Sequence, residues 1–284
     1  MSAESRMTSG GSRVLRKLPR LLAAVSAACI LAVVTLSGAA PANASGGSPT
    51  KCGFGIFIAV RGTGETGGSS PGLGGRTWNV GGLGRLIGVA SDFGTDPELP
   101  FWVESLNYPA QAGPFTGLAD PIYDSSIATG TTTLRAEIES IATSCPYTNI
   151  LLAGYSQGAQ VIGNVLASNS SPQLSSAARS HISSVVLMAD PSYRVDQPYD
   201  DVRNGTANGV YTRPAGVLNS WTRISWDTGS PVVTPIIHSW CWDNDQWCQG
   251  GIGPSAPIIH GSYGAAATQL EAYNFMRPWL ISQG

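Results

Sequence analysis

The sequence predicts an α/β fold, a three-layer sandwich in which a central, mostly parallel five-stranded sheet has helices on both faces. Two observations predict it. Apolar runs alternate along the chain with stretches that are compatible with helices, and each run is apolar throughout instead of alternating with polar residues. Strands of this kind are typical of a parallel sheet that is covered on both sides.

Each element is justified by its composition. The five strands are expected at residues 53–60, 101–106, 149–153, 182–188 and 232–240, where the apolar runs lie. The helices are expected near residues 84–90, 131–143, 158–168 and 265–281, in the stretches between and after these runs. In such a sheet, ligands and catalytic groups gather at the carboxyl ends of the strands. We therefore expect the functional residues at that edge.

Residues 1–44 are organised like a secretory signal peptide. Basic residues precede an apolar run over residues 21–36, and an A-x-A-type cleavage site ends at Ala44. An uncleaved membrane anchor is the alternative, but the run contains polar residues and is barely long enough to span a bilayer. We expect secretion to the extracellular space, with residues 45–284 forming a single catalytic domain that has no stable membrane insertion.

The composition limits the classes of partner. Beyond residue 44 the chain has 11 Lys and Arg against 17 Asp and Glu, so it lacks the basic charge that holds nucleic acid. Four of its five cysteines lie in this part, and an even number favours disulfides in an oxidising compartment. A zinc site is the alternative, but the sequence has no C-x-x-C pair or clustered histidines. We expect no metal and no cofactor.

The sequence Gly154-Tyr155-Ser156-Gln157-Gly158 follows a predicted strand and precedes a predicted helix. This is the setting of a nucleophile elbow in an α/β-hydrolase-like fold, where small neighbours allow close packing and leave the serine Oγ exposed. The glycine pattern at residues 62–67 also fits a dinucleotide-binding motif. No helix is expected after it, however, and a pyrophosphate site needs a helix N-terminus.

A serine hydroxyl becomes a nucleophile only beside a general base, which an acid must orient. The chain has three histidines. His181 would lie at the wrong end of a strand, and His238 is interpreted as a packing residue. His260 ends an apolar run just before the last helix. It also follows the acid candidates, as in the chain order Ser, Asp, His of α/β-hydrolases.

The acid is expected between Cys241 and Cys248, because two half-cystines so close together would hold the intervening loop rigid. Spacing alone leaves Asp243 and Asp245 as nearly equal candidates. Asp190, at the end of a predicted strand, is a third, with an alternative role as a turn former before proline.

The motifs together resemble those of the cutinases and cutinase-like serine esterases, a family that includes acetylxylan esterases. The elbow reads G-Y-S-Q-G, residues 61–66 match R-G-[ST]-x-E-T, residues 241–248 match C-x-x-x-D-x-x-C, and His260 begins H-x-x-x-G. A further cysteine pair of the family is matched by Cys52 and Cys145. The resemblance covers nearly all of residues 45–284 and is nearest to the secreted actinobacterial type.

The resemblance implies specific roles. It implies Ser156, Asp245 and His260 as the catalytic triad, with Asp245 rather than Asp243 at the family's aspartate position. It implies Thr63 and Gln157 as the residues of the oxyanion hole. It also implies the disulfides Cys52–Cys145 and Cys241–Cys248.

The implied activity is that of a secreted serine esterase acting on cutin-like polyesters or short-to-medium acyl esters through an acyl-enzyme. An acetylxylan esterase is the alternative, and a catalytically silent protein that binds cell-wall carbohydrate is a further one. We expect a monomer without a large lid, and an ester substrate from a lipid, a polyester or an acetylated polysaccharide. The isoleucines Ile252, Ile258 and Ile259 are expected either to form an acyl-binding rim or to anchor their loop to the core. The long 191–240 segment, with Trp221, Trp226 and Trp240, lies outside the shared motifs.

Overall fold

The structure is a computed structural model, and it describes residues 52–68, 77–99, 101–114 and 120–278. The predicted signal peptide and its boundary at residue 44 lie outside these residues. The division of the chain at that point therefore stays a prediction. Among the described residues, no helix combines the length and the apolar content that crossing a membrane requires.

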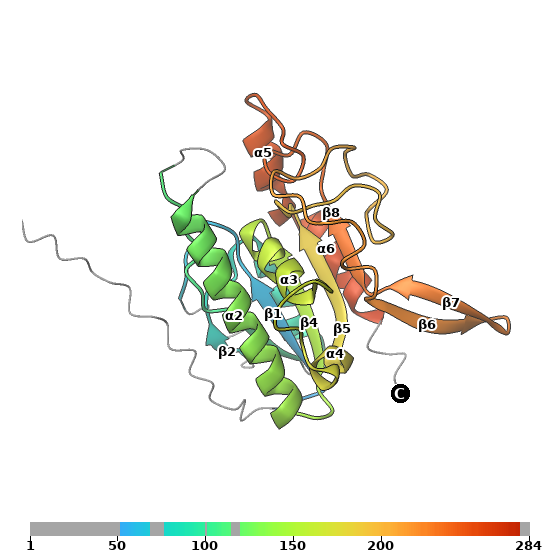
Figure 1. The fold of residues 1–284 in the computed structure, drawn as a ribbon. Helices are drawn as coiled ribbons and strands as arrows, with labels where there is room; N and C mark the ends of the chain where they lie inside the picture. Colours follow the sequence, from blue (N-terminus) through green and yellow to red (C-terminus); the bar gives the residue numbers. More distant parts are fainter. Residues whose placement is uncertain (1–51, 69–76, 100, 115–119, 279–284) are drawn as a thin grey trace, which may run out of the picture. The chain divides into compact units, whose positions relative to one another are not determined.

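The central sheet has six strands, and every neighbouring pair in it is parallel (Figure 1). In spatial order they are β2 (Thr77–Val80), β3 (Phe101–Ser105), β1 (Gly55–Val60), β4 (Asn149–Tyr155), β5 (Ile182–Met188) and β8 (Ile237–Trp240). The predicted α/β class is confirmed. The short edge strand β2 adds to the five strands that the sequence predicts.

Helices cover both faces of this sheet. The helices α2 (Pro121–Ser144), α3 (Gln157–Leu166) and α4 (Ser176–His181) pack on one face, and α1 (Ile87–Thr95) and α6 (Ala266–Met276) pack on the other. Alternate residues of β1 serve the two cores, because successive side chains of a strand point to opposite faces. Ile58 belongs to the core under α2 and α3, and Phe57 to the core under α1.

Three predicted helices differ in extent from those observed, and one of them, predicted at residues 265–281, is α6, which ends at Met276. The helix predicted at residues 131–143 begins earlier, at Pro121, because the Asp120 side chain caps it and accepts hydrogen bonds from the backbone N–H groups of Ile122 and Tyr123. The stretch predicted as a helix near residues 84–90 starts as a 3₁₀ turn, η1 (Gly84–Leu86), before α1. The short helix α5 (Ala256–Gly261) and the 3₁₀ turn η2 (Ser262–Gly264) lie where the sequence predicts a loop.

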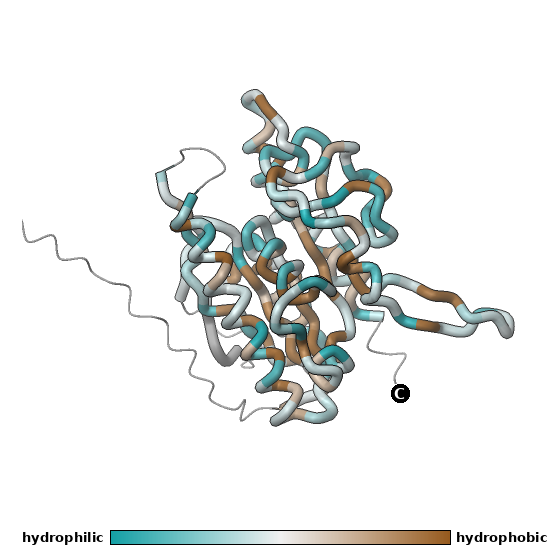
Figure 2. The backbone as a smooth tube through the Cα atoms, viewed as in Figure 1, coloured by the Kyte–Doolittle hydropathy of each residue, from teal (hydrophilic) through white to brown (hydrophobic). Residues whose placement is uncertain are grey.

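The strand predicted at residues 232–240 is wrong as a single element. Its first half is β7 (Ser230–Pro235), which pairs with β6 (Thr222–Asp227) in a separate antiparallel hairpin, and β8 alone joins the central sheet. Pro235 ends β7 and has no backbone N–H to continue a ladder. Figure 1 shows the hairpin standing clear of the central sheet, and Figure 2 shows hydrophobic segments both on that sheet and along the hairpin.

Candidate active site

Ser156 lies in the sharp turn between β4 and α3, with a backbone φ of 53° that few non-glycine residues adopt. Close packing explains the glycines on both sides of it. A Cβ atom at Gly158 would lie 1.9 Å from the Val60 carbonyl oxygen, and one at Gly154 would lie 2.6 Å from the Ala159 Cα. The strand, turn and helix therefore hold the serine at the carboxyl edge of the sheet.

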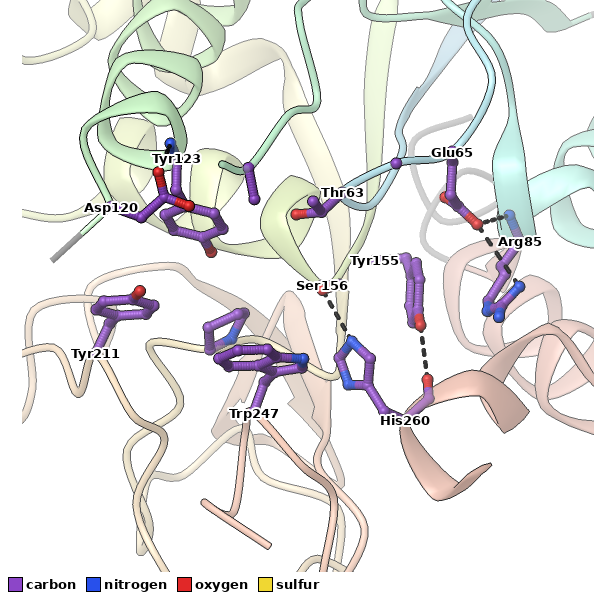
Figure 3. A pocket seen from close by; sticks show the side chains of 13 residues that line it. Thr63, Glu65, Arg85, Asp120, Tyr123, Tyr155, Ser156, Tyr211, Trp247 and His260 are labelled. Atoms are coloured by element: carbon purple, nitrogen blue, oxygen red, sulfur yellow. Dashed lines mark hydrogen bonds and ion pairs between the residues drawn. The ribbon is translucent and has the colours of Figure 1, made fainter. Parts of the chain in front are cut away.

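Three side chains from distant parts of the sequence meet at this turn, and Figure 3 shows two of them, Ser156 and His260. The Ser156 Oγ lies 3.0 Å from the His260 Nε2. The His260 Nδ1 lies 3.0 Å from each oxygen of the Asp245 carboxylate. The chain order Ser156, Asp245, His260 thus becomes a continuous hydrogen-bonded row, with the imidazole between hydroxyl and carboxylate.

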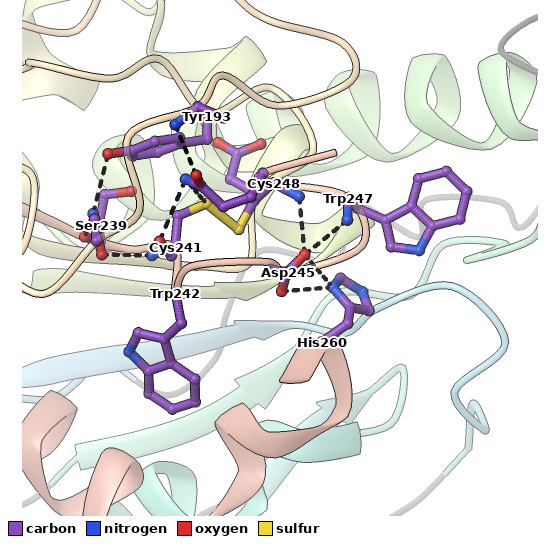
Figure 4. The surroundings of a disulfide bond; sticks show 12 residues. Tyr193, Ser239, Cys241, Trp242, Asp245, Trp247, Cys248 and His260 are labelled. Carbon is purple, nitrogen blue, oxygen red and sulfur yellow. Dashed lines mark hydrogen bonds and ion pairs between the residues drawn. A yellow bond between two sulfur atoms is a disulfide. The ribbon is translucent and has the colours of Figure 1, made fainter. Parts of the chain in front are cut away.

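The Asp245 carboxylate is fully buried and is held by its own loop (Figure 4). Its Oδ1 accepts hydrogen bonds from the backbone N–H groups of Trp247, at 2.8 Å, and Cys248, at 2.9 Å. A disulfide between Cys241 and Cys248 closes the loop around it. The carboxylate therefore has a fixed direction toward His260.

The other two acid candidates are placed elsewhere. Asp243 is exposed on the same loop. Asp190 is buried, forms an ion pair with Arg213 and accepts a hydrogen bond from the Ser192 backbone N–H. Asp190 therefore has a structural partner of opposite charge.

The remaining histidines make contacts away from Ser156. His181 ends α4, and its Nδ1 lies 2.7 Å from the Thr148 carbonyl oxygen. His238 lies on β8, with its Nε2 3.0 Å from the Asp201 carboxylate and its ring 4.2 Å from that of Trp240. Of the three histidines, His260 is the one that contacts the serine.

The loop after β1 brings Thr63 to the same pocket as Ser156. Two hydrogen bonds fix this loop: the Glu65 carboxylate accepts from the Gly62 backbone N–H at 2.7 Å, and the Gly64 N–H donates to the Ala110 carbonyl at 2.8 Å. Gly64 has a φ of +72°, a conformation that favours glycine. Thr63 is thereby held at the pocket in a loop that packs against the elbow, where a Cβ atom at Gly62 would lie 3.2 Å from the Ser156 Cβ.

Gln157 is the first residue of α3, so its backbone N–H has no acceptor within the helix and lies at the positive end of the helix dipole. Its side chain is buried and fully engaged. The Oε1 accepts from the Ser126 hydroxyl and the Nε2 donates to the Gln111 carbonyl. The backbone N–H is thus the group that Gln157 offers next to Ser156.

Two tyrosines contact the segments that hold His260 and Asp245, and no local feature of the sequence indicates either role. The Tyr155 hydroxyl donates to the His260 backbone carbonyl at 2.7 Å. Burial raises the pKa of Tyr155 to about 12, although the nearby Arg85 opposes this, so the hydroxyl keeps its proton. The buried Tyr263 hydroxyl accepts from the Trp242 N–H at 2.8 Å, and burial raises the pKa of Tyr263 well above its usual value.

A pocket of about 480 Å³ opens over the row of side chains (Figure 3). Aromatic side chains form one wall, namely Tyr123, Tyr211 and Trp247, and Figure 3 shows Glu65 and Arg85 on the side beyond Tyr155. None of the three isoleucines near His260 lines this pocket, and Ile259 is half-buried. Ile252 and Ile258 are 84% and 71% exposed, so they are not anchored in the core, and they do not line this pocket.

The tryptophans of the long segment have different surroundings. Trp221 is buried and donates from Nε1 to the Leu166 carbonyl, and Trp240 is buried on β8. Trp226 is exposed on the hairpin. A disulfide between Cys52 and Cys145 joins the segment before β1 to the end of α2.

This arrangement suits nucleophilic catalysis. A hydroxyl can pass its proton to an imidazole that a buried carboxylate orients, beside the first backbone N–H of a helix, which has no acceptor within the helix. In the part of the chain that the structure describes, no cluster of three or more His, Cys, Asp or Glu side chains is arranged to hold a metal ion.

Comparisons with known proteins give one family. Residues 52–278 match the family described as Cutinase. Cutinase 11 of Verticillium dahliae is 30% identical over 190 residues, which cover 64% of this chain and 58% of that protein. Phospholipase Culp4 of Mycobacterium tuberculosis is 29% identical over 235 residues, covering 80% of this chain and 82% of that protein. The catalytic core domain of acetyl xylan esterase from Trichoderma reesei superimposes with a TM-score of 0.61 at 26% identity, covering 81% of this chain and all of that domain.

Proposed function

Because this chain belongs to the cutinase family, we propose that it is a secreted serine esterase that hydrolyses the carboxylic ester bonds of cutin-like polyesters or of short-to-medium acyl esters. One observation carries the proposal: the 3.0 Å contacts that join the Ser156 Oγ to His260 and His260 to Asp245, at the floor of a pocket. The spacing is that of a nucleophile, its base and the carboxylate that orients the base.

In the first half of the proposed reaction, the Ser156 Oγ attacks the ester carbonyl carbon while the His260 Nε2 takes the hydroxyl proton. The negative charge that develops on the carbonyl oxygen is met by the backbone N–H groups of Thr63 and Gln157, and the Thr63 hydroxyl is a possible third donor. Asp245 accepts from the His260 Nδ1 and stabilises the imidazolium. The tetrahedral intermediate then breaks its bond to the alcohol oxygen, which takes the proton from His260 and leaves an acyl-enzyme on Ser156.

In the second half, water replaces the alcohol. His260 takes a proton from the water, the resulting hydroxide attacks the acyl carbon, and a second oxyanion forms at the same donors. When the bond to the Ser156 Oγ breaks, His260 returns its proton to that oxygen and the carboxylic acid departs. Each proton taken by the imidazole is returned, so the enzyme ends as it began.

A fluorophosphonate probe tests the nucleophile. The native protein should be labelled at Ser156, and Ser156→Ala should remain folded but unlabelled and almost inactive. Ser192→Ala, at another buried serine near the carboxyl edge, is the control and should keep its labelling. Labelling at another residue, or esterase turnover that survives in Ser156→Ala, would move the nucleophile elsewhere; an unlabelled native protein would favour the catalytically silent binder.

A second candidate function is that of an acetylxylan esterase. The aromatic wall of the pocket favours it, since Tyr123, Tyr211 and Trp247 offer faces on which a sugar ring can stack. Comparing rates on acetylated xylan with rates on cutin and tributyrin separates the candidates. A preference for acetylated xylan would select the second candidate and leave the proposed triad unchanged.

Secretion is part of the proposal. It is supported by the signal-peptide organisation of residues 1–44 and by the two disulfides, which persist in oxidising compartments. N-terminal sequencing of protein from the culture medium should find Ser45 or a residue close to it at the start of the mature chain.

A further inference from the structure

The β6–β7 hairpin has an apolar face that is largely exposed to solvent. Ile224 and Val233 lie opposite each other in the ladder and are 62% and 59% exposed, and Trp226 is 74% exposed. These three side chains and Pro231 share one face, because the side chains of a strand alternate and those of directly paired residues lie together. A two-stranded hairpin alone is only marginally stable in water, and an exposed apolar patch often marks an interaction surface.

The two edges of the hairpin differ. Its turn has a φ of 44° at Thr228 and 86° at Gly229, as in a type I′ turn, so the flanking pair Asp227 and Ser230 exchanges the first ladder hydrogen bonds. Hydrogen-bonded and non-hydrogen-bonded pairs then alternate along the ladder. The backbone N–H and C=O groups of the non-hydrogen-bonded residues point away from the partner strand. These outward residues are 222, 224 and 226 on β6, and 231, 233 and 235 on β7. Two of the three outward residues on β7 are prolines, which have no N–H.

The prolines therefore block the β7 edge against a further strand, whereas Thr222, Ile224 and Trp226 on the β6 edge all have backbone N–H groups to donate. The β6 sequence is also complementary to itself in an antiparallel arrangement. With Ser225 facing Ser225 of a second copy, Ile224 faces Trp226 of that copy. The backbone groups of Ile224 and Trp226 are the outward ones, so this register places ladder hydrogen bonds where donors and acceptors are available.

We propose that the hairpin is a self-association arm, through which two copies of this chain pair their β6 strands edge to edge into one four-stranded sheet. The pairing joins apolar side chains to apolar side chains, which stabilises cross-strand pairs. This inference does not depend on the proposed esterase activity, and it replaces the expectation of a monomer.

A single cysteine tests the register. Facing residues in a pair that is not hydrogen-bonded have Cα atoms about 4.5 Å apart, close enough for a disulfide. The variant Ser225→Cys of the secreted protein should form a covalent dimer under mild oxidation, which a non-reducing gel detects. Ser230→Cys is the matched control, since Ser230 is also exposed but lies on β7. We expect Ser225→Cys to cross-link at least about tenfold faster.

A pair of proline variants tests the edge. Ile224→Pro removes an outward N–H from β6, and Val233→Pro removes one from β7, at residues that face each other and are similarly exposed. Two edge strands form a small interface, so sedimentation equilibrium should show dimers with a Kd on the order of 10–100 µM. Ile224→Pro should weaken this association at least about tenfold, and Val233→Pro should leave it unchanged.

Three results would overturn the proposal. The first is a native protein that stays monomeric up to millimolar concentration. The second is equal cross-linking of the two cysteine variants, or equal weakening by the two prolines. The third is a monomer that binds phosphatidylcholine–phosphatidylglycerol vesicles through Trp226 but does not associate with itself, which would assign the hairpin to a lipid surface.

Discussion

For Asp245, the charge of the carboxylate and the direction in which hydrogen bonds are donated to it matter more than the shape of the side chain. Its oxygens accept from two backbone N–H groups and from the His260 Nδ1. In Asp245→Asn, the amide oxygen can keep the backbone contacts, but the NH₂ group then faces Nδ1 and forces the imidazole proton onto Nε2. An imidazole in that tautomer cannot accept the Ser156 proton, so kcat on p-nitrophenyl butyrate should fall by about 10⁴-fold.

Asp243→Asn is the control for this substitution. It makes the same chemical change two residues away, on an exposed side chain in the same disulfide-closed loop. Its kcat should stay within about twofold of the native value, as for other surface substitutions. If the two variants lost activity equally, the carboxylate that orients His260 would have to be reassigned.

Tyr155 is expected to act on His260 through the backbone. Its hydroxyl donates to the His260 carbonyl, and Tyr155→Phe removes that bond while keeping the ring that packs beside the imidazole. A hydrogen bond of this kind contributes about 1 kcal/mol, so kcat should fall roughly fivefold with KM almost unchanged. Tyr147→Phe, at a tyrosine that is 93% exposed, should change neither constant. A rise in KM alone would instead place Tyr155 in substrate binding.

At the scale of elements, Asp96 ties the end of α1 to α6. Its buried carboxylate accepts from the Tyr273 hydroxyl and from the Arg277 Nε. Burial by itself would raise the pKa of Asp96, but the hydrogen bonds from Arg277 and Tyr273 outweigh it and lower the pKa to about 2. The folded state thus favours the ionised form more than the unfolded state does.

This shift predicts how stability depends on pH. A depressed pKa contributes stability that is present above the unfolded value, near 4, and is lost as the pH falls through about 2. Asp96→Asn should lower the free energy of unfolding by about 2 kcal/mol at pH 7, and the difference should shrink below pH 3. Urea denaturation at several pH values measures it. Glu98→Gln, which removes an exposed partner of Arg277, should cost far less; an equal cost at every pH would show that ionisation of Asp96 is not involved.

At the scale of the whole molecule, the features that the sequence predicted well are those that depend on residues close together in the chain. The elbow around Ser156 needs a strand, a turn and a helix that are neighbours in the chain, and the continuous apolar runs predict a parallel sheet. The break between β7 and β8 was missed because an apolar run has the same composition whether it enters one sheet or two. Pro235 was the local signal for that break.

The walls of the pocket could not be predicted in this way. Tyr123, Tyr211 and Trp247 come from three separate segments, and nothing near each of them in the sequence distinguishes a pocket residue from a core residue. The choice of Asp245 over Asp243 likewise needed either the family resemblance or the coordinates, because both lie in the same short loop. The isoleucines near His260 looked like a hydrophobic rim, yet the folded chain leaves Ile252 and Ile258 in solvent.

The pocket as a whole predicts the preferred acyl length. Its volume of about 480 Å³ lies in the lower half of the range for small-ligand sites, so an acetyl to octanoyl ester fits within its walls whereas a palmitoyl chain must extend into solvent. Values of kcat/KM for p-nitrophenyl esters should therefore peak at short-to-medium chains. Trp247→Ala, which removes one wall, should move the peak to longer chains without changing the rate on the acetate ester more than a few fold. A steady rise in the native protein out to palmitate would mean that the acyl chain binds outside this pocket.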